Sequence, residues 1–164
     1  MKSGKGETEK GISMRLRVEH GGEPFKWIGV GWMDATAGWE GGMRDGDFAI
    51  AKYAPDGSLF EAGDYNLRNV LVGAPREDHQ QDLLKVGGKF GLSFNEFFFL
   101  RALDTGDDLD DVVIDGAKSQ TFVFAGGRGP VFGYHQDTRT ALTIDFVTGE
   151  VHEAEPSTDA GEPQ

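Results

Sequence analysis

Apolar and polar side chains alternate with a period of two along much of this chain. Residues 12–19 show it most clearly, because Ile12, Met14, Leu16 and Val18 are separated by polar residues. Such a period places successive side chains on opposite faces of a β-strand and does not match the repeat of a helix. The other segments read as strands are 25–32, 47–53, 58–62, 89–95, 96–103, 119–125 and 141–147.

Turn signals separate these segments at intervals of roughly 8 to 12 residues, which is typical of an all-β fold. We therefore expect an antiparallel β-sandwich of immunoglobulin-like type. The segment 63–74 is compatible with a short strand or a loop, and the polar segment 75–82 with one turn of helix. The last expected strand places Leu142 and Ile144 inside, and Thr143 outside.

The expected organisation is one sandwich domain at residues 12–148. Residues 1–11 are polar and glycine-containing, which predicts a flexible lead-in, and they lack the apolar core of a signal peptide. Residues 149–164 are acidic and contain proline, so we expect a disordered tail or a linker to a neighbouring domain.

Charge and cysteine content exclude several classes of function. The 28 acidic and 16 basic residues give a net charge of −12, which argues against nucleic acids and anionic membrane surfaces as partners. The absence of cysteine excludes disulfides, zinc–thiolate sites, iron–sulfur clusters, thiol nucleophiles and covalent c-type haem attachment. No apolar run of about twenty residues exists, so we expect no direct membrane insertion. A Gly-x-Ser-x-Gly nucleophile motif is also missing, which disfavours a hydrolase.

Two groups of residues invite a binding interpretation. The acidic stretch 104–111 has carboxylates at a spacing that suits calcium, but it lacks the EF-hand pattern. A solvated connection between strands, with Arg101 paired to one aspartate, is the favoured interpretation of this stretch. Trp27, Trp32, Trp39 and Tyr134 could together stack against a sugar. By strand parity, however, Trp27 and Trp32 point to opposite faces, so one of them belongs to the core.

Met43 and His135 form a third candidate site. Each precedes an expected strand, Met43 before 47–53 and His135 before 141–147. A thioether and an imidazole are a known pair of axial ligands for one haem iron. Taken alone, a methionine before a strand is more often a core residue, and a loop histidine is more often a surface residue.

Five segments in this order resemble the DOMON family, a group of β-sandwich domains. The family includes the amino-terminal region of dopamine β-monooxygenase and the cytochrome domain of cellobiose dehydrogenase. The segments are GVGW (29–32), GMRDGDF (42–48), PREDHQQD (75–82), FLRALDTGDDLD (99–110) and YHQDTR (134–139). The resemblance covers roughly residues 12–148. The chain departs from it in having Asp45 and Gly46 where Gly-Ser is commoner, and in lacking cysteines.

The haem-binding branch of this family implies a non-covalent haem b with Met43 and His135 as its axial ligands. It implies a b-type cytochrome domain that transfers single electrons and is not itself an enzyme. The expected partner is a redox protein or a membrane cytochrome, and the expected location is extracytoplasmic. By their proximity in sequence to Met43 and His135 alone, Trp39, Arg44, Tyr134 and Arg139 are candidates for contact with the haem or its propionates.

Two alternatives use the same fold without a redox role. One is a DOMON-type binding module for a carbohydrate or another small ligand, in the pocket that haem would otherwise fill. The other is a structural accessory domain with a bound cation. The resemblance and the Met43–His135 pair favour the cytochrome over both.

Overall fold

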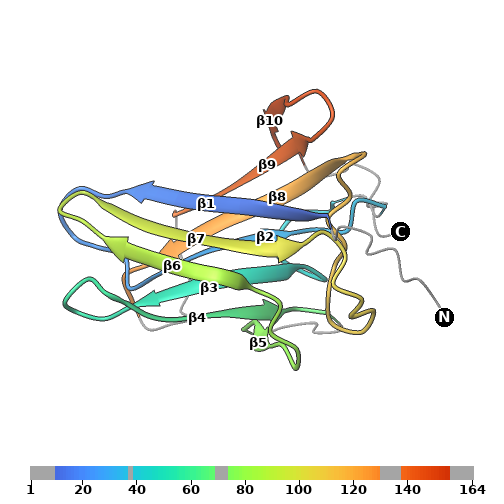
Figure 1. Cartoon of the computed structure of the whole chain (residues 1–164). Helices are drawn as coiled ribbons and strands as arrows, with labels where there is room; N and C mark the ends of the chain where they lie inside the picture. The colour runs from blue at the N-terminus through green and yellow to red at the C-terminus, as the bar shows by residue number, and fades with distance from the viewer. Residues whose placement is uncertain (1–9, 37–38, 69–73, 130–137, 156–164) are drawn as a thin grey trace, which may run out of the picture.

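Ten strands and no helix make up the described part of the chain, which comprises residues 10–36, 39–68, 74–129 and 138–155 of a computed structural model. The strands form two antiparallel sheets, one of three strands and one of seven (Figure 1). The sheets stack on one another and do not close into a barrel. This arrangement confirms the predicted all-β sandwich.

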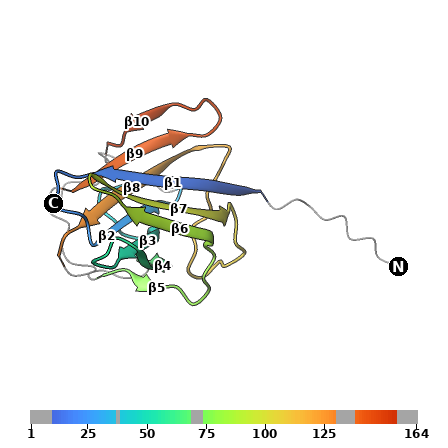
Figure 2. The same cartoon turned by 60° about the vertical axis from the view of Figure 1, so that its left-hand side comes forward.

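Strand order differs from chain order in both sheets. The smaller sheet contains, in spatial order, β1 (Gly11–Glu19), β7 (Phe94–Ala102) and β6 (Leu84–Phe90). The larger sheet contains, in spatial order, β10 (Val151–Glu153), β9 (Arg139–Asp145), β8 (Ser119–Gly127), β2 (Trp27–Trp32), β3 (Asp47–Tyr53), β4 (Leu59–Asn66) and β5 (Arg76–Glu77). Figure 2 shows the smaller sheet covering part of the larger one.

The main core lies between the sheets and is rich in aromatic side chains. Trp32 of β2 is fully buried there, and its ring centroid lies 6.5 Å from that of Phe99 on β7. The indole Nε1 of Trp32 donates a hydrogen bond to the carbonyl oxygen of Val112 at 3.0 Å, so its one polar atom is satisfied. Phe97 and Phe122 are also fully buried in this core.

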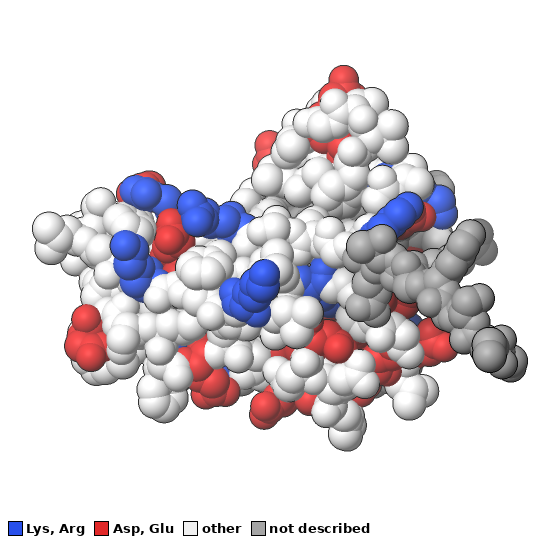
Figure 3. All heavy atoms as spheres, in the orientation of Figure 1, with Lys and Arg blue, Asp and Glu red and all other residues white. Residues whose placement is uncertain are grey.

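The outer face of the smaller sheet is basic and aromatic, although the chain as a whole is acidic. The apolar residues of β1 face the core, while Arg15 and Arg17 point outward. Their guanidinium carbons lie 5.9 and 4.0 Å from the ring centroids of Phe98 and Phe94 on β7. Figure 3 shows several Lys and Arg side chains over this face and acidic side chains below it.

The hairpin between β6 and β7 corrects one expected strand. The segment 89–95 was expected to alternate through Phe90, Leu92 and Phe94, but Leu92 lies in the turn and is 98% exposed. The amide of Gly91 donates to the carbonyl of Phe94 at 2.6 Å and closes this turn. The apolar residues at positions 90, 92 and 94 therefore belong to two different strands and the turn between them, and their regular spacing does not mark a single strand.

The polar segment 75–82 contains no helical turn, which corrects a second expectation. Arg76 and Glu77 instead form β5 and pair with β4. The side chain of Gln81 replaces further strand pairing: its Oε1 accepts from the amide of Asp64 at 2.8 Å, and its Nε2 donates to the carbonyl of Asp64 at 3.1 Å. The side-chain amide of Gln81 thus forms hydrogen bonds with the backbone N–H and C=O of Asp64, which a continued neighbouring strand would otherwise form.

The larger sheet extends beyond residue 148, where the expected domain ended. Strand β10 pairs with β9, with Val151 opposite Ile144 and Glu153 opposite Leu142. Gly149 takes a positive φ of 77° in the connecting turn. The expected boundary therefore falls inside a hairpin, while residues 1–9 and 156–164 lie outside the described part.

Candidate functional site

The outer face of the larger sheet is apolar, unlike the exposed face of an ordinary sandwich sheet. All six residues of β2 are buried, so this strand is covered on both faces. A cavity of about 560 Å³ lies against its outer face. The floor of this cavity is formed by alternate residues of three neighbouring strands: Gly29 and Gly31 of β2, Phe48 and Ile50 of β3, and Val123 and Ala125 of β8.

Glycine at two positions of β2 keeps this floor open. A Cβ atom at Gly31 would lie 2.3 Å from the ring of Phe48, and one at Gly29 would lie 3.1 Å from Cγ1 of Ile50. Both distances are shorter than ordinary van der Waals contact. Any larger residue at these positions would displace its neighbours or fill the cavity.

One wall of the cavity comes from the connection between β2 and β3. Trp39, Gly41, Gly42 and Met43 line it, and Nε1 of Trp39 donates to the carbonyl of Gly42 at 3.1 Å. Gly41 and Gly42 have φ values of 94° and 80°, a conformation that glycine adopts without strain. The amide of Gly46 donates to the carbonyl of Met43 at 3.3 Å, which closes the turn that presents Met43.

The opposite wall comes from β9 and β10. Arg139, Thr140 and Ala141 of β9 line the cavity together with Glu153 and Ala154. Arg139 pairs with Ala125 and therefore brings a charged side chain to a site whose floor is apolar. Glu153 pairs with Leu142, so its side chain points to the other face of the sheet. Because residues 149–164 were expected to form a disordered tail or a linker, the contribution of β10 to this wall was not predicted.

The structure brings some of the predicted site residues together and leaves others outside its described part. Met43 and Trp39 both line the cavity, as does Arg139. Arg44 is exposed and its Nε lies 3.5 Å from Oδ2 of Asp45. The expected ligand His135 and its neighbour Tyr134 lie outside the described residues. The pairing of Met43 with His135 therefore stays a prediction.

The parity argument for the tryptophans is confirmed. Trp27 lies on the outer face of β2 and lines the cavity, whereas Trp32 points into the core between the sheets. The expected platform of four aromatic residues is therefore divided: Trp27 and Trp39 line the cavity and Trp32 does not.

A buried cluster of carboxylates next to the core was not foreseen from the sequence. Nη2 of Arg101 lies 2.8 Å from Oδ2 of Asp47 and 2.8 Å from Oδ2 of Asp111. The Arg101–Asp111 contact confirms the expected ion pair between Arg101 and the acidic stretch. Asp64 lies beside them, and one carboxylate oxygen from each of Asp47, Asp64 and Asp111 lies within 4.8 Å of the others.

Burial dominates the electrostatics of this cluster. It raises the pKa of Asp64 to about 7, because the charged form is poorly solvated and the positive charge of Arg101 compensates only in part. Burial likewise raises the pKa of Asp47 well above its ordinary value. The only sequence signal for the cluster was a charged residue, Arg101, in an otherwise apolar strand.

Comparison with models of known protein families and with curated proteins gives no match for this chain. The resemblance to the DOMON family therefore rests on the five sequence segments alone. Among the described residues, no helix is long and apolar enough to cross a membrane.

Proposed function

We propose that the cavity on the outer face of the larger sheet binds one haem b non-covalently, and that the protein transfers single electrons. The observation that carries the proposal is the position of Met43, whose side chain lines an apolar cavity. The volume of about 560 Å³ is within the range of cofactor sites in proteins. The sequence resemblance assigns Met43 the same role independently of this cavity.

The lining residues suit a large, flat and mostly apolar ligand. Gly29 and Gly31 leave the middle of the floor without side chains, and Phe48 and Ile50 flank it. Trp27 and Trp39 add aromatic surface. These residues would exclude water from a bound macrocycle.

One basic side chain of the lining suits a propionate of the ligand. Arg139 lines the cavity on the β9 side and pairs with Ala125 of the floor. A guanidinium binds a carboxylate through paired, charge-assisted hydrogen bonds. Arg139 is therefore the described residue best suited to hold a propionate.

Chain length is compatible with His135 as the second ligand. His135 precedes Arg139 by four residues, and a fully extended chain of four residues spans at most about 14 Å. Because Arg139 lines the cavity, this span allows an imidazole to reach it.

A bound haem would supply one-electron redox chemistry. The thioether of Met43 and the imidazole of His135 would hold its iron, and this pair of ligands would favour the reduced state and so raise the reduction potential. The residues of the cavity would thus bind, orient and shield the group and take no part in bond-making. A redox protein or a membrane cytochrome as partner, and an extracytoplasmic location, follow from the resemblance and form part of this proposal.

Visible absorption spectra of the full chain, expressed with haem supplementation, test the proposal. We expect reduced protein to show the sharp α and β bands of a low-spin, six-coordinate haem. Met43→Ala and His135→Ala should each remove this spectrum, because each variant lacks one axial ligand. Circular dichroism should show that both variants retain the all-β fold.

Two variants serve as matched controls for this experiment. Met33→Leu removes a second thioether, which is buried close to Gly46 but does not line the cavity. His152→Ala removes an exposed imidazole on β10. Both should keep the wild-type spectrum. The proposal is wrong if wild-type protein takes up no haem, or if Met43→Ala keeps the low-spin bands.

A second candidate function is the binding of a carbohydrate or another small ligand in the same cavity. It is favoured by the combination of Trp27 and Trp39 with Arg139, since aromatic faces with a polar group at the rim are common in ligand sites. Protein that stays colourless after haem supplementation, but whose melting temperature rises with glycans, would support this alternative. Trp39→Ala should then abolish the shift.

A further inference from the structure

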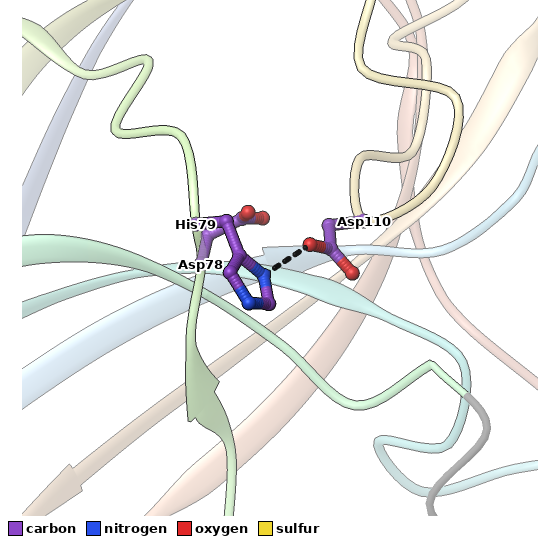
Figure 4. Close-up of side chains that lie close together, drawn as sticks. All are labelled: Asp78, His79 and Asp110. Atoms are coloured by element: carbon purple, nitrogen blue, oxygen red, sulfur yellow. Dashed lines mark hydrogen bonds and ion pairs between the residues drawn. The ribbon is translucent and has the colours of Figure 1, made fainter.

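One histidine and two aspartates meet at the molecular surface, outside the cavity. Asp78 and His79 follow β5, and Asp110 belongs to the acidic stretch 104–111 (Figure 4). In Figure 4 the side chains of Asp78 and His79 extend from one segment toward Asp110 on the other. Residues that are 31 positions apart in the sequence are thereby brought together.

The three side chains have the spacing of ligands to a single metal ion. Nδ1 of His79 lies 3.0 Å from Oδ2 of Asp110, and one ligand atom from each of the three residues lies within 4.8 Å of the others. Metal–ligand bonds of about 2.0–2.2 Å place adjacent ligand atoms roughly 3 Å apart. A small closing movement of Asp78 would complete the set, since His79 and Asp110 already have this separation.

Asp78 supplies a second, independent observation. It is only 5% exposed, and its Oδ2 is buried without a hydrogen-bond partner. Its other oxygen accepts from the amide of Gln80 at a long 3.3 Å. Burial of a carboxylate oxygen without a donor is costly, and a bound cation would remove that cost.

Both segments are fixed to the fold, so the three residues do not meet by chance movement of loops. The amide of Asp78 donates to the carbonyl of Asp64 on β4 at 3.0 Å. Asp111, the residue after Asp110, is held by Nη2 of Arg101 on β7, which lies 2.8 Å from its Oδ2, and its carbonyl accepts from Nη1 of Arg68 at 2.8 Å. Pre-positioned ligands lose little conformational entropy when an ion binds.

We propose that Asp78, Nδ1 of His79 and Asp110 bind one divalent transition-metal cation of the zinc class, with water in the remaining positions. The imidazole nitrogen favours zinc over calcium and magnesium, which prefer oxygen ligands. The ion would join the segment after β5 to the acidic stretch. This site is separate from the cavity and does not depend on haem.

Without a metal ion, His79 and Asp110 form an exposed ion pair. The hydrogen bond that Nδ1 of His79 donates to the carboxylate of Asp110 raises the pKa of His79 above its ordinary value, so a proton competes with a metal ion for Nδ1. Zinc binding should therefore be measured at pH 8, where the imidazole is more often neutral.

Isothermal titration of the full, chelator-treated chain with ZnCl₂ tests the site. We expect one ion per chain in the wild type. His79→Ala and Asp110→Asn should each weaken binding about tenfold or more, since each removes a direct ligand. Both side chains lie at the surface, His79 being 93% exposed, so the variants should fold. Asp78→Asn, which keeps the shape of the side chain, should have the same effect if circular dichroism confirms its fold.

His152→Ala is the matched control. His152 is also exposed and has one carboxylate nearby, with Nε2 lying 3.8 Å from Oε2 of Glu150, but it belongs to no three-residue group among the described residues. This variant should bind zinc as the wild type does. The proposal is overturned if the wild type binds no zinc, if His79→Ala keeps full affinity, or if His152→Ala weakens binding as much as His79→Ala.

Discussion

Gly31 lies in the cavity floor between Phe48 of β3 and Val123 of β8, its partners in the two neighbouring strands. Glycine is unfavourable in the interior of a strand because it loses much conformational entropy on folding. Here it creates space, since the Cβ of any other residue would overlap the ring of Phe48. Glycine at this position lowers the local stability of the strand, but it leaves room for a ligand against the cavity floor.

Gly31→Ala should reduce both ligand binding and stability. We expect a loss of about 1–3 kcal/mol in the free energy of unfolding, because Phe48 must leave its preferred position. The displaced ring should also lower haem uptake. Urea unfolding and haem titration measure the two effects. Gly21→Ala, where no atom lies within 4 Å of the added Cβ, should change neither.

Single residues differ in how far their role follows from the sequence. Strand parity placed Trp27 and Trp32 on opposite faces correctly, because two residues on one strand have a fixed relation. Met43 was predicted as a ligand and does line a cavity. By contrast, Asp64 could not be assigned to a buried cluster, since its partners Asp47 and Arg101 come from other strands.

At the scale of elements, β10 forms one end strand of the larger sheet. Oδ1 of Asp145 accepts hydrogen bonds from the amides of Val147 and Thr148 at 2.8 and 2.9 Å, which stabilises the turn before β10. The composition of this segment is polar and acidic, so the sequence predicted a tail. A short, exposed edge strand needs few apolar residues, and composition alone does not distinguish it from a tail.

Two truncated chains test the contribution of β10. A chain that ends at Thr148 lacks β10 and the cavity residues Glu153 and Ala154, whereas one that ends at Ala154 retains them. We expect the shorter chain to be less stable by about 1–2 kcal/mol, the sum of three cross-strand pairs. Its ligand affinity should also fall. Equal affinity and equal urea midpoints for the two chains would contradict this role.

Two strands rich in apolar residues were predicted closely, although one has a single buried face and the other is buried on both faces. The segment 47–53 coincides with β3, and 12–19 differs from β1 by one residue. The expected strand 58–62 is shorter than β4, which continues to Asn66. The continuation contains Asp64 and Asn66, and buried polar residues hide a strand from a search for apolar alternation.

At the scale of the whole molecule, the buried carboxylate cluster connects the two sheets. Arg101 belongs to β7 of the smaller sheet, whereas Asp47 and Asp64 belong to β3 and β4 of the larger one. Asp111 comes from the connection between β7 and β8. Because this cluster spans both layers, its protonation affects the stability of the entire fold.

Stability should therefore depend on the protonation of Asp64. Its pKa is about 7 in the folded protein, compared with an ordinary value of 3.8, so folding favours its protonated form. The stability that this group contributes is fully present below about pH 4 and is lost as the pH rises through 7. The free energy of unfolding should fall by roughly 2–4 kcal/mol between these two pH values.

Asp64→Asn should remove this dependence, because the amide resembles the protonated acid. Urea unfolding of both proteins from pH 4 to pH 8, in the presence of a chelator, gives the difference in stability at each pH. We expect the variant to gain stability relative to the wild type as the pH rises. A difference that stays constant over this range would contradict the assignment.

The burial of β2 on both faces also determines where the molecule can move. It lies between β8 and β3, so its amide hydrogens are protected by neighbours on either side. Such amides exchange with solvent only when the entire domain opens, whereas the turns and end strands exchange through local fluctuations. The floor is consequently the part of the cavity whose amide hydrogens exchange most slowly. The walls around Met43 and Arg139 are the parts that can adjust to a ligand.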